Sequence, residues 1–128
     1  MRRLLLEGTL FSGKEEGMKF IILPWVTRQI KEKLGFEPFP GTLNLKLSER
    51  DMKNKAALDR SKGIEILPPL GYCRGRLFKA EMGKIDCAIV IPDVLDYPKD
   101  TIEIIASENL RKRLQLFDGS KVEVYAFI

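Results

Sequence analysis

The chain has 128 residues, a length typical of one domain with one hydrophobic core, and we expect a single domain over residues 1–128. Hydrophobic residues make up 45% and charged residues 31% of the chain, which is the range of globular proteins and excludes the disordered class. The net charge of +4 suits anionic ligands such as phosphates. No apolar run approaches the roughly 20 residues of a membrane span, and the N-terminus lacks a signal peptide, so we expect a cytoplasmic protein without a membrane partner.

The residue types also limit the chemistry. The chain has no His and two Cys, Cys73 and Cys87, which excludes His-based triads and multi-cysteine zinc sites. A catalyst must therefore use carboxylates, hydroxyls, amides, Lys, Arg or a bound metal. The two cysteines are not spaced as a metal or redox pair, and we predict two buried reduced thiols without a role.

The N-terminal third predicts a strand, a helix and a second strand. Residues 3–11 form a short apolar run that ends at Ser12-Gly13, as a buried strand entering a turn does. Pro24 can occupy the first turn of a helix that Gly35 ends, and apolar residues recur at four-residue spacing between them. Residues 42–47 alternate polar with apolar side chains, which is typical of a half-buried strand.

The rest of the chain predicts mostly strands. Residues 48–63 fit a surface loop or a short helix, and we leave both open. Ser107 can cap a short helix through Leu114. Four extended runs predict strands, at 72–80, 85–91, 101–106 and 121–128. We expect the first three of them to be antiparallel neighbours. Six or seven short strands joined by tight turns favour a mainly β fold closed into a small barrel, because closure removes exposed strand edges.

Thr42 and Asn44 are the strongest candidates for a ligand site. Residues two apart on a strand point the same way, so the Thr42 hydroxyl and the Asn44 amide oxygen can converge on one hard cation. A Mg²⁺-nucleotide fits such a pair of oxygen ligands. The spacing alone is more typical of two solvated polar residues on an amphipathic strand.

Three further segments have possible roles at an anion site. The glycines of residues 12–17 allow backbone amides to face an anion, and Lys14 adds a charge, although such a loop is more often a hairpin connection and this one lacks the Walker A ending. The helix start at 107–111 could hold a phosphate on its free amides, or simply be capped. Glu103 is a candidate base if it faces a pocket, whereas most such strands place the carboxylate in water.

Two stretches of the chain carry a family resemblance. Residues 35–45 read Gly-Phe-Glu-Pro-Phe-Pro-Gly-Thr-Leu-Asn-Leu. Downstream, Ile-Glu-Ile-Ile-Ala at 102–106 is followed by Asn-Leu-Arg at 109–111 and by Leu-Phe-Asp-Gly at 116–119. In this order and spacing the segments resemble the archaeal CTP-dependent riboflavin kinases, and the resemblance covers nearly the whole chain.

The resemblance implies a small closed six-stranded cradle-loop barrel, of the riboflavin-kinase type, with one or two short helices. It implies transfer of the γ-phosphate of CTP to the 5′-hydroxyl of riboflavin, giving FMN and CDP, with Mg²⁺ as cofactor. The expected partners are riboflavin or FMN and CTP or CDP, without nucleic acid, and we expect a monomer.

The resemblance also implies roles for individual residues. Thr42 and Asn44 would bind the metal. Glu103 would contact the flavin, and we add the hypothesis that it accepts the proton of the attacking hydroxyl. The nucleotide-binding residues would be Gly13, Lys14, Glu15, Glu16, Gly17, Met18, Glu108, Asn109, Leu110 and Arg111.

Two positions depart from the family pattern. The nucleotide loop of the family commonly reads Gly-x-Gly-x-Gly, and Glu15 stands at its middle position here; Leu95 stands where relatives often carry a flavin-contacting Thr. The alternative function is therefore a non-catalytic flavin- or nucleotide-binding barrel. The presence of Thr42, Asn44 and Glu103 argues against this alternative. A nucleic-acid-binding barrel is disfavoured, because the basic residues are dispersed among acidic ones.

Overall fold

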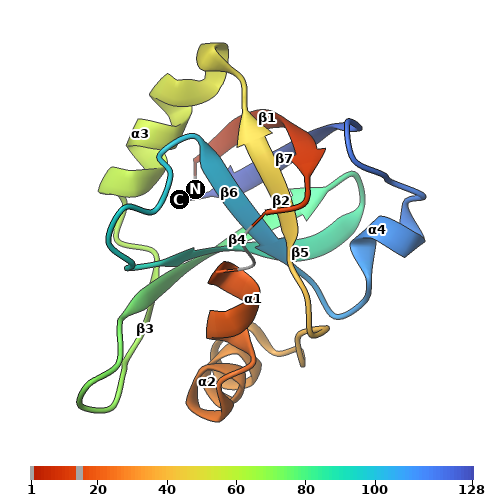
Figure 1. Cartoon of the computed structure of the whole chain (residues 1–128). Coiled ribbons are helices and arrows are strands. Elements are labelled where there is room, and N and C mark those ends of the chain that lie inside the picture. The colour runs from red at the N-terminus through yellow and green to blue at the C-terminus, as the bar shows by residue number, and fades with distance from the viewer. Residues whose placement is uncertain (1, 14–15) are drawn as a thin grey trace.

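The framework of the molecule is an antiparallel sheet that closes on itself (Figure 1). The structure, a computed structural model, describes residues 2–13 and 16–128. The strands of this part are β1 Arg3–Phe11, β2 Leu43–Leu47, β3 Ile64–Ile66, β4 Gly75–Met82, β5 Ile85–Pro92, β6 Thr101–Ile105 and β7 Lys121–Phe127. They lie in the order β3-β4-β5-β6-β2-β1-β7, and β4 also pairs with β7. Six strands thus form a closed barrel, as predicted, and β3 extends the sheet outside the ring.

The barrel joins the two ends of the described chain. β1 pairs with β7 from Arg3 opposite Phe127 to Thr9 opposite Lys121, and with β2 near its other end. The closing pair of β4 and β7 is short, with Ala80 opposite Ala126. The N and C marks therefore lie close together in Figure 1.

The hydrophobic core has two parts on the two sides of the sheet. The barrel interior is filled by large buried side chains that include Leu6, Leu10, Leu45, Phe78, Ile89, Ile102 and Ile104. A second cluster lies outside the barrel, where two helices cover β4, β5 and β6, and includes Phe20, Ile21, Val26, Ile30, Leu77, Val90 and Ile105. β6 is consequently buried along its whole length. A polar side chain on its outer face is removed from water.

The helices are short and lie around the barrel (Figure 1). They are α1 Glu16–Ile21, α2 Pro24–Leu34, a 3₁₀ turn at Glu49–Asp51, α3 Met52–Arg60 and α4 Leu110–Arg113. The predicted helix is confirmed in α2, which begins at Pro24 and ends at Gly35 in the left-handed conformation (φ 82°). None of the described helices is long and apolar enough to cross a bilayer.

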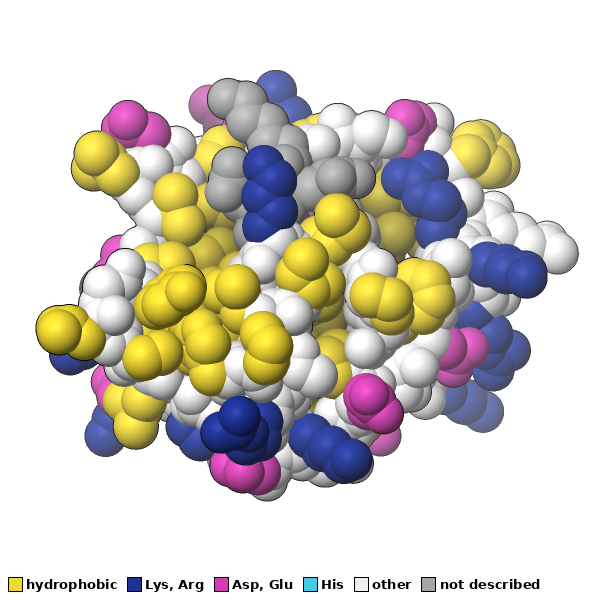
Figure 2. All heavy atoms as spheres, turned by 60° about the horizontal axis from the view of Figure 1, so that its bottom comes forward, with side chains coloured by type: hydrophobic (Ala, Val, Ile, Leu, Met, Phe, Trp, Pro, Cys, Tyr) yellow, Lys and Arg dark blue, Asp and Glu magenta, His cyan; other side chains and the backbone are white. Residues whose placement is uncertain are grey.

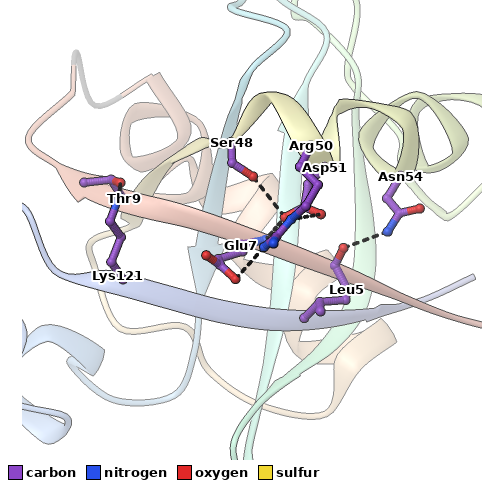
Figure 3. A network of polar contacts seen from close by, with 8 residues as sticks. All are labelled: Leu5, Glu7, Thr9, Ser48, Arg50, Asp51, Asn54 and Lys121. Carbon is purple, nitrogen blue, oxygen red and sulfur yellow. Dashed lines mark hydrogen bonds and ion pairs between the residues drawn. The ribbon is translucent and has the colours of Figure 1, made fainter.

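Segment 49–60 covers an edge of β1 that no strand pairs (Figure 3). Asp51 Oδ2 accepts the backbone N–H of Glu7 at 2.8 Å, and Asn54 Nδ2 donates to the Leu5 carbonyl at 2.9 Å. Arg50 forms an ion pair with the Glu7 carboxylate at 2.9 Å. Side chains of this segment thus replace the ladder hydrogen bonds that a neighbouring strand would supply.

Several sequence expectations need correction. Of the two alternatives left open for residues 48–63, the short helix is confirmed, as α3. The cap of α4 is Asn109, whose side chain accepts from the Lys112 N–H at 3.2 Å, and not Ser107. Cys87 is buried but Cys73 is exposed, because it lies in the loop before β4 and outside both core clusters. The strand β3 and the helix α1 were not predicted.

Candidate active site

Glu103 is buried on the outer face of β6, with 2% of its surface exposed. The Thr42 hydroxyl donates to Oε1 at 2.8 Å, and the Tyr97 hydroxyl donates to Oε2 at 2.5 Å. The two hydroxyls come from the segment before β2 and from the loop between β5 and β6. Both carboxylate oxygens therefore accept a hydrogen bond, and the structure places this carboxylate away from bulk water.

Asn44 lies directly opposite Glu103 in the pairing of β2 with β6, so both side chains project from the same face. Asn44 is 7% exposed, less than an outward polar residue of an amphipathic strand would be. The reason is the segment after β1: a Cβ added to Gly13 would lie 3.2 Å from Asn44 Cγ and 3.3 Å from its Oδ1. Gly13 allows the backbone to pass close over the Asn44 amide.

A small cavity of about 190 Å³ joins Thr42 to the start of α4. Its lining residues are Phe39, Gly41, Thr42, Leu43, Ile104, Ala106, Glu108, Asn109, Leu110 and Arg111. The backbone bond from Phe39 N–H to the Ala106 carbonyl at 2.8 Å holds the two sides of the cavity together. A predicted metal residue and all four predicted nucleotide residues of 108–111 thus share one hollow.

The four residues at α4 are not equivalent. Leu110 is buried in the barrel core, so only its backbone is available to a ligand. Asn109 uses its side-chain oxygen as the helix cap, and Glu108 forms an ion pair with Arg113 at 3.2 Å. Arg111 is the one member of the four with a partly exposed cationic side chain, which makes it the natural contact for a phosphate.

The predicted nucleotide loop is described in part. Gly13 lies beside Asn44, while Lys14 and Glu15 are outside the described residues. Glu16, Gly17 and Met18 are not loop residues but begin α1, whose chain runs on to the buried Ile21.

Sequence reasoning assigned no role of their own to three residues at this site: Ser12, Tyr97 and Asp118. The Ser12 hydroxyl donates to Asp118 Oδ2 at 2.9 Å, and Arg111 Nη2 donates to Asp118 Oδ1 at 3.0 Å. These two hydrogen bonds, that from Ser12 first, hold the pKa of the Asp118 carboxyl below its usual value. Asp118 lay within the family stretch 116–119, but no local signal connects it with Ser12.

The donors at Thr42, Asn44 and Glu103 fit a hard divalent cation. Thr42 uses its hydroxyl hydrogen for Glu103, so the lone pairs of Oγ1 remain for a ligand. Asn44 adds an amide oxygen on the same face. Oxygen donors with a nearby carboxylate suit Mg²⁺, which keeps substrate phosphates and waters as its other ligands. Among the described residues no group of three His, Cys, Asp or Glu lies together as an all-protein metal cage.

A larger hollow lies elsewhere among the described residues. It measures about 970 Å³ and is lined by parts of β4 and β5, the end of α2 and residues 61–64, with none of the predicted site residues. It contains neither Thr42 nor any of the residues at the start of α4, and size alone does not make it the candidate site.

Figure 2 shows a broad apolar surface on the face of the molecule that it draws. Its large exposed side chains include Ile22, Leu67, Leu70 and Tyr72. Trp25 packs edge-on against Tyr72, with ring centroids 5.5 Å apart, so the end of α1, the start of α2 and the loop before β4 form one surface. The Asp93 N–H bonds to the Arg74 carbonyl at 2.8 Å, which places the loop of Tyr97 beside that surface.

Comparison with known proteins gives a family model and several relatives that agree with one another. The family model CTP-dep_RFKase, described as a domain of unknown function, DUF120, matches residues 10–126. A riboflavin kinase of Archaeoglobus fulgidus is 38% identical over 123 residues, which cover 93% of this chain and 53% of that protein. Riboflavin kinases of Pyrobaculum aerophilum and Ignicoccus hospitalis are 42% and 37% identical, and the matches cover 59% and 70% of those proteins. The chain thus spans little more than half of the first two relatives.

Proposed function

This chain belongs to the CTP-dependent riboflavin kinase family, and from that premise we propose that it is a Mg²⁺-dependent kinase that converts riboflavin and CTP into FMN and CDP. The observation that carries the proposal is the convergence of Thr42, Asn44 and Glu103 beside the cavity at α4. Phosphoryl transfer needs positioned oxygen ligands, a cation for the phosphates and a group that orients the attacking hydroxyl. This one face offers a candidate for each.

The nucleotide is proposed to lie along the cavity toward α4. Arg111 would contact its phosphates with guanidinium N–H groups, and the backbone of 108–110 would face the remaining polar atoms. The segment at Gly13 would cover the phosphates from the other side. The donor CTP follows from the family, whereas the relatives carry only the name riboflavin kinase.

Riboflavin is proposed to approach from the Tyr97 side of Glu103. Its flat tricyclic ring is largely apolar, and the exposed apolar surface that begins at the neighbouring loops can bury such a ring. The 5′-hydroxyl at the end of the ribityl chain would then reach Glu103. Leu95, with 90% of its surface exposed, supplies an apolar contact where a Thr would supply a hydrogen bond.

Glu103 is proposed to orient the 5′-hydroxyl and accept its proton. The hydrogen bonds from Thr42 and Tyr97 fix the plane of the carboxylate. The hydroxyl oxygen forms a bond to the γ-phosphorus, the bond from that phosphorus to the bridging oxygen breaks, and CDP leaves. Positioning of this kind supplies a large share of the rate.

Thr42 and Asn44 are the proposed protein ligands of Mg²⁺, which when bound offsets the negative charge of the phosphate oxygens. The role of this chain is to keep the two ligands in place. The hydrogen bond to Glu103 fixes the Thr42 rotamer, and Gly13 confines the Asn44 amide.

The test is conversion of riboflavin to FMN by the purified chain with Mg²⁺, with CTP, ATP, GTP and UTP in parallel and chromatographic separation of the flavins. FMN formed preferentially with CTP supports the proposal. Folded protein that forms no FMN with any donor overturns it. Titration with riboflavin and CDP then distinguishes a binding-only barrel from a barrel with another ligand.

A further inference from the structure

Asp118 occupies a turn between α4 and β7 and contacts both proposed walls of the nucleotide site. It accepts a hydrogen bond from Ser12, at the end of β1, and forms an ion pair with Arg111, on α4. Ser12 directly precedes Gly13, which lies over Asn44, and Arg111 lines the cavity that contains Thr42. One carboxylate therefore connects two segments that are about one hundred residues apart in the sequence.

The position of this carboxylate is fixed by the backbone and not by its own hydrogen bonds. The Leu10 N–H bonds to the Ser120 carbonyl, and the Gly119 N–H bonds back to the Leu10 carbonyl, both at 2.8 Å. Gly119 has a φ of 95°, a conformation that glycine adopts without strain, so the turn is sharp at this point. The turn is tied to the end of β1, and Asp118 is presented to Ser12 and Arg111 as a ready-made acceptor.

The exposure of the ion pair between Arg111 and Asp118 indicates that it orients a side chain and does not mainly stabilise the fold. The side chains of Arg111 and Asp118 are 40% and 57% exposed, and ion pairs this close to water add little to the stability of a fold. Such ion pairs do restrict the direction of a long side chain such as that of Arg111. Arg has five N–H donors in a planar fork, so one bond to Asp118 fixes the guanidinium and leaves other donors for a phosphate.

Resting on the proposed function, we infer that Asp118 is a positioning residue for the donor nucleotide. It acts through Arg111 and Ser12, holding the guanidinium and the start of the nucleotide loop at a fixed separation before the nucleotide arrives. A preformed site avoids the entropic cost of ordering these groups on binding. The residue affects nucleotide affinity and leaves the transfer step to Thr42, Asn44 and Glu103.

The test compares Asp118→Ala, Asp118→Asn and Ser12→Ala with wild type. For Asp118→Ala we expect the KM for CTP and the Kd for CDP to rise about 5- to 20-fold, with kcat and the KM for riboflavin within about twofold. Asp118→Asn keeps an acceptor for Ser12 but loses the charge that faces Arg111. Its KM for CTP and its Kd for CDP should therefore lie between those of wild type and those of Asp118→Ala. Adding Ser12→Ala to Asp118→Ala should cost nothing further, because both remove the same bond.

Asp86→Ala is the matched control, since Asp86 is an exposed aspartate on β5 away from the proposed site. It should leave all four constants unchanged. A CTP KM within twofold of wild type in Asp118→Ala overturns the inference, as does a loss of kcat at unchanged KM. A rise in both substrate KM values together with a lower melting temperature in both Asp118 variants would show a structural role instead, and also overturns it.

Failure of the proposed function is visible separately. A wild-type chain that binds CDP in calorimetry but forms no FMN overturns the kinase assignment, while the CDP Kd of the variants still decides the role of Asp118. A wild-type chain that binds no CDP overturns both.

Discussion

Glu103 combines deep burial with two hydroxyl donors, an arrangement that a carboxylate on an exposed strand face does not have. Burial makes its interactions stronger than they would be in water, and the donors hold the group in one orientation. Thr42 also links it to the proposed metal ligands.

Glu103→Gln should lower kcat about 100-fold or more, because an amide cannot accept the hydroxyl proton and presents only one acceptor oxygen to two donors. The KM for CTP should change little. Steady-state kinetics of FMN formation measure both constants. Tyr97→Phe, which removes one hydrogen bond and keeps the carboxylate, is the control and should cost only a few-fold in kcat. Full turnover of Glu103→Gln would contradict the assigned role.

Asn44→Ala should remove most of the activity and leave the fold intact. The side chain is proposed to bind Mg²⁺, and loss of one oxygen ligand weakens the hold on the cation, so we expect a drop of about 100-fold at low Mg²⁺ with partial recovery at high Mg²⁺. Titration of FMN formation against Mg²⁺ measures this. Lys46→Ala, two residues along the same strand and exposed, is the control. Full turnover of Asn44→Ala at low Mg²⁺ would show that the metal assignment is wrong.

The sequence allowed only part of the site to be predicted. The period of two along 42–47 placed Thr42 and Asn44 on one face, which needs no tertiary information. Ser12, Tyr97 and Asp118 were assigned no role of their own because they lie in loops, and a loop residue is brought to a site by the pairing of distant strands. Asp118 reaches Ser12 only because β7 pairs with β1.

Side chains of the 3₁₀ turn and of α3 attach this segment to β1 (Figure 3). Asp51→Ala should lower the free energy of unfolding by about 1–3 kcal/mol, because the half-buried Glu7 N–H loses the buried carboxylate that accepts from it. Denaturant titration measures the change. Asp51→Asn keeps one acceptor oxygen and should cost less. Equal stability of Asp51→Ala and wild type would show that water replaces the carboxylate.

The elements that were predicted are those whose own residues specify them. Pro24 and Gly35 delimit α2, and alternating or continuous apolar runs mark the barrel strands. β3 is three residues long, too short to show a period, and it exists because Ile64 and Ile66 pair with β4. α1 carries few helix signals of its own and is held by Phe20 and Ile21 in the outer core. Tertiary packing therefore determines that β3 and α1 form, and this packing cannot be seen in the local sequence.

The whole molecule gives its two cysteines opposite environments. Burial, with smaller effects from Asp86 and Glu81, raises the pKa of the Cys87 thiol to about 12, so at pH 8 it is protonated and unreactive. Cys73 is exposed. A disulfide reagent such as DTNB at pH 8 should therefore modify one thiol per folded chain and two in guanidinium. Cys73→Ser should show no fast reaction when folded; a fast reaction of that variant would mean that the barrel opens readily.

The pairing of the first strand with the last also sets how the chain must fold. β1 is synthesised well before its main partner β7, which lies at the other end of the barrel sequence. Until then the apolar side chains of β1 have no complete barrel to enter, and a large loop must be closed before the ladder forms. Contacts between such distant residues make folding slow compared with that of helical domains of similar size. We expect barrel closure to be a late, cooperative event of milliseconds to seconds, with the helices able to form earlier.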